Sequence, residues 1–360
     1  MQQSMIDFPA IPVVDVRDGG PVRHAREACE RARALRDACL AWFPRAAHPA
    51  APLLDAVTRR WLARSRSPYV DEIAAIAAEL QIPGIWFLNG SYQWGCTSLA
   101  REENGVPWLA RTLDWPFSGL GRHVEVARMA GPAGEFWNVT WPGFVGVLTA
   151  MAPSRFAACM NQAPWRRRMR HPWLRPADML VNSISIWPVT HIPPDQLLRQ
   201  VFEHCRSFAE ARERLATTPI ARPAIFTLAG CSHDQRCVIE RTEEGCSVRE
   251  DSTSAANDWL VAREPWEARI GGEIFLTCSY QQAGENSRSR REALAAWSGS
   301  FAGESFAWVA PPVLNKYTRV AVEACPADGI LRVMGYELPP GAAWADPVTR
   351  PCEIAAVLAA

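Results

Sequence analysis

The way strand-like segments follow one another along the chain constrains its fold most strongly. From residue 96 onward these segments come in close succession, and helices rarely separate them. Strands joined without helical crossovers form antiparallel meanders, which argues against a doubly wound parallel sheet. The sequence therefore predicts an α+β fold with antiparallel sheets covered by helices. We expect strands at 96–101, 106–113, 123–129, 135–140, 144–150, 155–161, 223–229, 235–240, 245–249, 273–277, 318–325 and 330–336.

The first part of the chain has a different character. Apolar residues recur with helical spacing over 21–43, 53–64 and 69–81, and Pro83-Gly84 ends the third segment. Residues 85–88 form a short apolar run. We therefore expect a mainly helical segment, 1–95, followed by a strand-rich portion, 96–360, within one structural domain. Further helices are expected over 194–204, 207–217 and 287–298.

Charge and composition exclude several classes of protein. The chain has 38 basic and 38 acidic side chains, so it lacks the one-signed field that favours nucleic acid, and we expect no such partner. No apolar run reaches the ~18 residues of a membrane span. The first residues lack the charge and apolar pattern of a secretion signal, so we expect a cytoplasmic protein. The 11 cysteines are scattered and odd in number, which indicates reduced thiols.

Common cofactor and metal motifs are absent from the sequence. It contains no Gly-rich nucleotide loop, no P-loop and no Gly-x-Ser-x-Gly nucleophile elbow. The best metal candidate groups Cys231, His233 and Cys237, but their spacing is not a standard zinc spacing. A turn between strands with half-buried thiols explains them better. We expect neither a metal nor a cofactor.

A predicted turn fixes the register of one hairpin. Asn104-Gly105 lies between two strand-like segments and is a strong hairpin signal. If these residues form the turn, Cys96 pairs with Leu113, and residues of the same parity share its face. Arg111 then becomes a diagonal neighbour of the Cys96 thiol.

Asp114 is the residue after Leu113, so in a regular strand its side chain does not share the face of Cys96. It would need a bulge or the end of the strand to reach the Cys96 thiol. A thiol, a guanidinium and a carboxylate would then lie within a few residues of one another, and a nearby cation lowers the pKa of a thiol. This cluster suits nucleophilic catalysis at Cys96. A buried thiol beside a surface ion pair is the alternative.

The same residues resemble a known family. The stretch 96–117, with Cys96-Thr-Ser and Arg111-x-x-Asp114, is similar to the start of the catalytic subunit of acid ceramidases and N-acylethanolamine acid amidases. Residues 87–95, 143–161 and 275–294 resemble further blocks. These proteins belong with choloylglycine hydrolases and penicillin acyltransferases among the N-terminal nucleophile enzymes. The resemblance implies a four-layer αββα sandwich of two antiparallel sheets with a helical N-terminal segment.

The resemblance also implies self-cleavage between Gly95 and Cys96. Segment 1–95 would become the smaller subunit and 96–360 the catalytic one. The freed α-amino group has an unperturbed pKa of about 8 and can act as general base for the thiol of the same residue. Arg111 would orient the site and lower the thiol pKa. Asp114 would hold the α-ammonium group or assist cleavage.

Other roles are implied farther along the chain. Asn161 would line the site as an oxyanion donor, or be a turn residue. Arg290 or Arg291 would lie near the site, and of these we select Arg291; an exposed helix arginine is the alternative. The family often has an asparagine where this chain has Cys278, so Ser279, Asn161 or a backbone amide would supply the donor, or activity would be weak.

These residues together predict a function. We expect a cysteine amidase that hydrolyses a linear carbon–nitrogen amide bond of a small N-acyl substrate through a Cys96 thioester. An acyltransferase would use the same residues, and an uncleaved relative could bind acyl chains without catalysis. Tryptophans cluster between residues 108 and 187. We expect Trp115 and Trp141, with Tyr280, to contact the substrate.

The segment 165–175 is unusually basic. It holds five arginines and two tryptophans within eleven residues, a combination that suits a water–lipid boundary. We expect a weak membrane or micelle contact here, at the mouth of the substrate pocket. A solvated loop whose arginines pair with acidic residues is the alternative. A homo-oligomer is compatible with the sequence.

Overall fold

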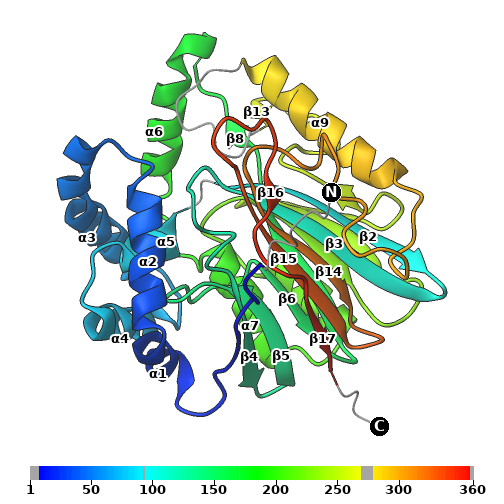
Figure 1. The fold of residues 1–360 in the computed structure, drawn as a ribbon. Coiled ribbons are helices and arrows are strands. Elements are labelled where there is room, and N and C mark those ends of the chain that lie inside the picture. The colour runs from blue at the N-terminus through cyan, green and yellow to red at the C-terminus, as the bar shows by residue number, and fades with distance from the viewer. Residues whose placement is uncertain (1–7, 92–93, 170, 269–278, 357–360) are drawn as a thin grey trace, which may run out of the picture.

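Two large sheets lie face to face in the computed structural model, which describes residues 8–91, 94–169, 171–268 and 279–356 (Figure 1). The first sheet is antiparallel except for its β1–β4 pair. Its strands, in spatial order, are β1 (Val13–Asp15), β4 (Glu125–Gly131), β5 (Gly134–Thr140), β6 (Thr149–Ala152), β7 (Phe156–Gln162), β9 (Ala224–Ala229), β10 (Arg236–Arg241) and β11 (Cys246–Arg249).

The second sheet is antiparallel throughout its described pairs. Its strands, in order, are β12 (Ser254–Ala255), β2 (Gly95–Glu103), β3 (Val106–Asp114), β14 (Thr318–Cys325), β15 (Ile330–Glu337) and β16 (Asp346–Pro347), and β17 (Cys352–Ala355) also pairs with β15. A separate ribbon joins β8 (Trp165–Arg166) to β13 (Trp266–Glu267).

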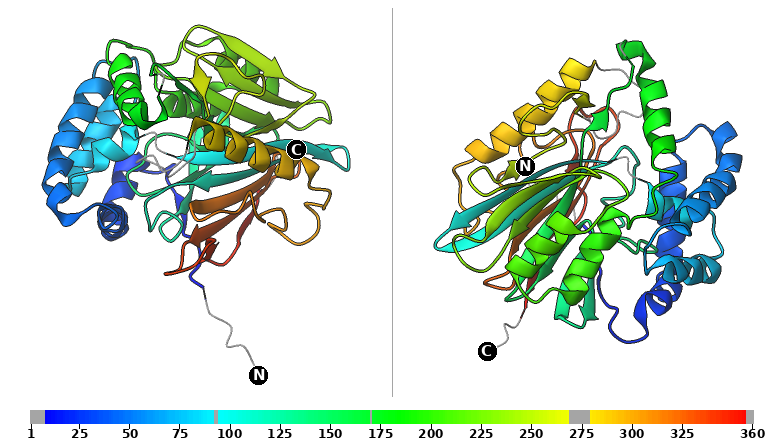
Figure 2. Two further views of the ribbon diagram at one scale, coloured as in Figure 1. Left: turned by 90° about the horizontal axis from the view of Figure 1, so that it is seen from above. Right: turned by 180° about the vertical axis from the view of Figure 1, so that it is seen from behind.

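Helices cover both outer faces of this sandwich (Figure 2). Helices α7 (Pro194–His204) and α8 (Phe208–Thr217) pack on the first sheet, and α9 (Tyr280–Ala296) packs on the second. The four-layer αββα arrangement is thereby confirmed. The N-terminal segment lies at one side of it and forms α1 (Gly20–Glu27), α2 (Cys29–Leu40), η1 (Arg45–Ala50), α3 (Ala51–Leu62), α4 (Val70–Leu80) and α5 (Ile85–Gly90).

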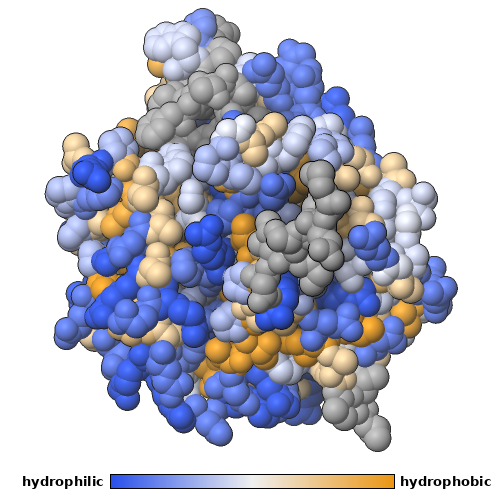
Figure 3. All heavy atoms as spheres, in the orientation of Figure 1, coloured by the Kyte–Doolittle hydropathy of each residue, from blue (hydrophilic) through white to orange (hydrophobic). Residues whose placement is uncertain are grey.

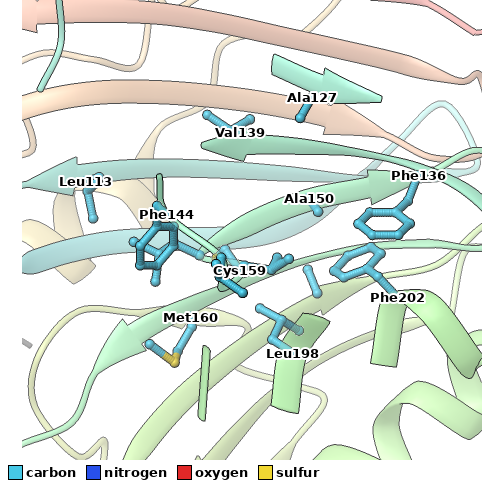
Figure 4. Close-up of a cluster of buried hydrophobic side chains, with 14 of the residues drawn as sticks. Leu113, Ala127, Phe136, Val139, Phe144, Ala150, Cys159, Met160, Leu198 and Phe202 are labelled. Atoms are coloured by element: carbon cyan, nitrogen blue, oxygen red, sulfur yellow. The ribbon is translucent and has the colours of Figure 1, made fainter. Parts of the chain in front are cut away.

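One hydrophobic core joins the layers and the helical segment. Phe202 of α7 packs against Phe136 of the first sheet, with ring centroids 5.4 Å apart (Figure 4). It also packs against Phe156, with centroids 4.8 Å apart. Leu35 and Ile73 from the N-terminal helices belong to the same core. Residues on both sides of the Gly95–Cys96 bond are therefore packed together as one unit.

Most predicted elements are confirmed, and the differences have local causes. The expected helix 21–43 is two helices that meet at Ala28. The expected strand 144–150 begins only at Thr149. Helix α9 starts seven residues earlier than predicted, because Ser279 and Gln282 form a capping box. The expected strand 273–277 lies outside the described residues.

A helix that begins at the last residue of the basic segment was not predicted. After η2 (Pro172–Leu174), α6 (Arg175–Ser185) carries both charged and apolar side chains. Asp178 ties it to the preceding chain, because its carboxylate accepts from the backbone N–H groups of Arg168 and Met169 at 2.8 and 3.0 Å.

Candidate active site

The β2–β3 hairpin has the predicted register. Asn104 and Gly105 form the turn with φ of 54° and 88°, as a type I′ turn requires. Cys96 lies opposite Leu113, and Ser98 lies opposite Arg111. The side chains of Cys96 and Arg111 therefore lie on one face of the hairpin, between the two sheets.

Arg111 holds the Cys96 thiol. Its Nη2 lies 3.0 Å from Cys96 Sγ, and its Nη1 donates to Thr149 Oγ1 at 2.5 Å. Nη2 also donates to the Met160 carbonyl oxygen at 3.3 Å. Burial raises the pKa of the Cys96 thiol, while the charge and hydrogen bond of Arg111 lower it. The expected effect of Arg111 is thus present, but burial outweighs it in the intact chain.

The main chain of Cys96 is held from the opposite face. Its backbone N–H donates to Asn257 Oδ1 at 3.0 Å. Arg290 Nη2 donates to the same oxygen at 2.9 Å, and Arg290 Nη1 donates to the Cys96 carbonyl and to Thr97 Oγ1 at 2.7 Å each. Asn257 and Arg290 are both buried. Asn257 was not among the predicted site residues.

The Asp114 carboxylate lies next to the Arg290 guanidinium. Strand β3 ends at Asp114, and the neighbouring β14 shifts register between Thr318 and Val320, but the Asp114 carboxylate still faces Arg290 and not the Cys96 thiol. Asp114 Oδ1 accepts from Thr318 Oγ1 at 3.0 Å, and Oδ2 lies 3.5 Å from Arg290 Nη1. The carboxylate therefore supports the arginine that binds the Cys96 carbonyl, and it lies across the sheet from the thiol.

Asn161 joins the two sheets next to this cluster. Its Nδ2 donates to Ser98 Oγ at 2.9 Å and to the carbonyls of Ala255 and Ala256 at 3.3 Å each. Ser98 in turn lies 2.9 Å from Thr227 of the first sheet. These bonds already use the amide N–H groups of Asn161. Its role as an oxyanion donor stays a prediction, and Thr277 and Cys278 lie outside the described residues.

Of the two arginines considered, Arg290 contacts the Cys96 main chain, whereas the selected Arg291 pairs elsewhere. Arg290 and Arg291 are consecutive on α9, so their side chains point in different directions. Arg290 faces the second sheet, whereas Arg291 pairs with Asp258 at 3.2 Å and lines a separate polar cavity. Tyr280 lines the same cavity, and its hydroxyl donates to Asp178.

The two predicted tryptophans form an aromatic cluster beside the hairpin. Trp115 directly follows Asp114, and its ring centroid lies 4.9 Å from that of Trp94 and 6.2 Å from that of Trp141. The indole N–H of Trp141 donates to the Leu120 carbonyl at 2.7 Å. Trp94 directly precedes Gly95, and its contact with Trp115 matches the pairing of Gly95 with Asp114 in the hairpin.

An apolar cavity of about 180 Å³ opens beside Trp115. Its walls come from the N-terminal helices on one side and from the chain after β3 on the other. They include Leu35, Leu40, Phe43, Leu54, Phe87, Leu88, Trp115, Phe117 and Leu120. An apolar cavity of ~150 Å³ already admits a benzene-sized molecule. Apolar side chains also reach the surface over these helices (Figure 3).

The basic segment is partly neutralised by neighbours. Arg166 pairs with Glu243 at 3.1 Å, and Arg167 pairs with Glu267 at 2.8 Å. These pairs fit the alternative of a solvated segment with paired arginines. Among the described residues, no cluster of three histidine, cysteine or acidic side chains could hold a metal, and no helix is long and apolar enough to cross a membrane.

Comparison with known proteins gives matches to two groups of enzymes. The chain is 27% identical over 222 residues to a probable acid ceramidase of Caenorhabditis elegans, covering 56% of this chain and 54% of that protein. It is 26% identical over 185 residues to the N-acylethanolamine-hydrolyzing acid amidase of Oryctolagus cuniculus, covering 49% of each. This chain is a homologue of the acid ceramidases and N-acylethanolamine-hydrolyzing acid amidases. It spans about half the length of the curated relatives it matches.

Solved structures give weaker likenesses. An N-acylethanolamine-hydrolyzing acid amidase ortholog of Caenorhabditis elegans aligns with a TM-score of 0.45 and 16% identity, over 64% of this chain and 93% of that one. A mutant conjugated bile acid hydrolase of Clostridium perfringens aligns with a TM-score of 0.39 and 11% identity, over 72% of this chain and 92% of that one. No family model matches the chain.

Proposed function

We propose that this protein is a self-processing cysteine amidase that hydrolyses the linear amide bond of an N-acyl compound through a thioester at Cys96. The observation that carries the proposal is that two different residues bind the side chain and the backbone nitrogen of Cys96. The Cys96 thiol contacts Arg111, and the Cys96 backbone nitrogen contacts Asn257. A nucleophile and a future α-amine are thereby positioned together.

Self-cleavage begins with attack of the Cys96 thiol on the Gly95 carbonyl carbon. The carbon–nitrogen bond breaks, the acyl group moves to sulfur, and the Cys96 nitrogen becomes a free amine. Water then hydrolyses the thioester, which releases the Gly95 carboxylate and restores the thiol. Arg111 stabilises negative charge on the sulfur during attack, while Arg290 fixes the Cys96 carbonyl.

The freed amine serves the second reaction as general base. Its unperturbed pKa is about 8, so part of it is neutral near pH 7 and can accept the thiol proton. The thiolate attacks the substrate carbonyl, and the α-ammonium group returns the proton to the leaving amine. Water then attacks the acyl thioester and yields a carboxylic acid and the free thiol. Asn257 Oδ1 holds the nitrogen through each proton transfer.

The apolar cavity beside Trp115 fits the acyl chain. Its lining of leucine, phenylalanine and tryptophan side chains would gain free energy by removing a hydrocarbon tail from water. The names of the homologues point the same way, since one group hydrolyses N-acylethanolamines. The substrate class is therefore an amide with an apolar acyl chain.

Trapping the acyl-enzyme tests this proposal. Purified protein is mixed with N-decanoylethanolamine, quenched in acid within milliseconds to seconds, and analysed by mass spectrometry of proteolytic peptides. We expect a decanoyl group on Cys96 that disappears on treatment with hydroxylamine. The Cys96→Ala variant should carry none, while a control variant of the exposed Cys246, Cys246→Ala, should react as the wild type does. Turnover without any acyl group on Cys96 would overturn the proposal.

A further inference from the structure

Arg111 is a buried cation whose hydrogen bonds, within the described residues, all go to uncharged groups. Their partners are Thr149 Oγ1, the Met160 carbonyl oxygen and the Cys96 thiol. Its Nε has no hydrogen-bond partner among these residues. A buried charge without a counter-ion is unfavourable, and it favours negative charge on a group that it contacts. The position of this guanidinium therefore decides which group it helps to ionise.

Two of these acceptors belong to the sheet opposite Arg111. Thr149 lies in β6 and Met160 lies in β7, both in the first sheet. Arg111 and Cys96 lie on the β2–β3 hairpin of the second sheet. Nη1 donates to Thr149 at 2.5 Å, and Nη2 donates to Met160 at 3.3 Å and lies 3.0 Å from the thiol sulfur. The first sheet thus holds a charge that the second sheet carries.

Thr149 fixes the orientation of the guanidinium plane. The guanidinium is rigid and planar, so the position of Nη1 determines where Nη2 points. Met160 offers a backbone carbonyl, and Thr149 offers the side-chain oxygen that accepts from Nη1. This oxygen has a defined place, because Thr149 pairs with Val139 on one side and Cys159 on the other. A β-branched side chain also has few rotamers.

We propose that Thr149 is a positioning residue that aims Arg111 at the Cys96 thiol. This inference rests on the proposed role of Cys96 as the nucleophile of an amidase. Without the Thr149 hydroxyl, Nη1 becomes a buried donor without an acceptor, and the guanidinium turns toward another one. Nη2 then leaves the thiol, and the thiolate loses the charge that stabilises it. The first sheet in this way controls the reactivity of a nucleophile carried by the second.

Thr149→Val tests the hydroxyl with little change of shape. We expect the pH profile of Cys96 alkylation by iodoacetamide to move to higher pH by about one unit, the size of shift that loss of a hydrogen bond to a charged group causes. Thr149→Ser restores a hydroxyl and should bring back the wild-type profile. With N-decanoylethanolamine, kcat should fall at least tenfold in Thr149→Val protein, while KM stays within threefold. Peptide mass spectrometry reads cut and uncut chains separately, so slow self-cleavage does not obscure the comparison.

Thr227→Val is the matched control for the alkylation profile. Thr227 is as buried as Thr149 and also pairs with Cys159, from the other side. Its hydroxyl lies 2.9 Å from Ser98 Oγ instead of accepting from Arg111. The substitution therefore removes an equally buried hydroxyl from the same sheet, and the Cys96 profile should stay in place. An equal shift in both valine variants would overturn the positioning role.

A double-variant cycle separates positioning from a general loss of stability. If Thr149 acts through Arg111, Thr149→Val should shift the profile no further in Arg111→Gln protein. A further shift of the same size there would overturn the role. Thermal unfolding checks that each variant is folded. If the valine protein does not fold, Thr149→Ala takes its place in the cycle with the same expected direction of shift.

The positioning role and the amidase function fail on different measurements. An unmoved profile in folded Thr149→Val protein, with hydrolysis of N-decanoylethanolamine by the wild type, would overturn the positioning role and leave the amidase standing. A wild type that hydrolyses no N-decanoyl amide would overturn the amidase function. The alkylation profiles would then still decide whether Thr149 aims Arg111 at the thiol.

Discussion

Arg111 Nη2 lies 3.0 Å from the Cys96 sulfur, in a hairpin whose register places the two side chains on one face. Both residues are buried, so the guanidinium acts in a medium of low dielectric constant. Burial raises the pKa of the Cys96 thiol, and Arg111 opposes this more than Arg290 does. The chemistry proposed for Cys96 depends on this contact.

Removal of the Arg111 charge should therefore raise the pKa of the Cys96 thiol. In Arg111→Gln protein we expect the pH profile of Cys96 alkylation by iodoacetamide to move to higher pH, because less thiolate is present at each pH. Amide turnover should fall at least tenfold. Peptide mass spectrometry follows the alkylation, and thermal unfolding checks the folded state. An unmoved profile in folded protein would show that Arg111 does not activate the thiol.

Arg290 and Arg291 are neighbours on α9, so substitutions of the two can be compared directly. Arg290→Gln removes the donors to the Cys96 carbonyl and to Asn257, so turnover and self-cleavage should each fall at least tenfold. Arg291→Gln loses the mostly buried pair with Asp258 but keeps the Arg290 donors to the Cys96 main chain, so it should retain self-cleavage within threefold. Gel analysis of cleavage over time measures both. Equal effects of the two substitutions would contradict the placement of Arg290.

Asp114→Asn tests the carboxylate that supports Arg290. The neutral amide can still accept from Thr318, but it loses the charge 3.5 Å from Arg290. We expect turnover to fall at least tenfold on fully processed protein, with the thiol alkylation profile less affected than in Arg111→Gln protein. Thr318→Val, which keeps the charge, should have a smaller effect on turnover. Near-normal turnover of Asp114→Asn would remove Asp114 from the site.

The burial of Cys237 predicts how the free energy of unfolding changes at alkaline pH. Burial raises the pKa of Cys237 from 9.0 to about 12, so the folded chain keeps a proton that the unfolded chain loses above pH 9. The free energy of unfolding should therefore decrease between pH 9 and 12, by about 1.4 kcal/mol per pH unit for one such thiol. Cys237→Ala should reduce this slope, as urea unfolding at pH 8 to 10.5 would show. An unchanged slope would contradict the assignment.

The register of the central hairpin could be predicted because local chemistry specifies it. Asn104-Gly105 permits the positive φ angles of a two-residue turn, and that turn fixes every pair back to Cys96. Helices with clear apolar periodicity were likewise predicted, as at α4 and α7. The start of α9 was missed because its capping residue lies outside the periodic part of the helix.

The partners of the Cys96 main chain could not be predicted in this way. Asn257 follows a two-residue strand, which is too short to show a period, and its bond to Cys96 spans 161 residues. Sequence alone also could not decide between Arg290 and Arg291. A rotation of about 100° per residue separates their side chains, so the choice depends on how α9 lies on the second sheet.

Intact mass spectrometry under denaturing conditions tests the central claim most directly. Wild-type protein should separate into chains 1–95 and 96–360, the second beginning with a free Cys96 amine, while native chromatography keeps them together because they share one core. Cys96→Ala protein should remain a single chain of 39.9 kDa, as the sequence requires apart from the substitution. A wild-type chain that stays whole yet hydrolyses amides, or a Cys96→Ala chain cut at the same bond, would contradict the account.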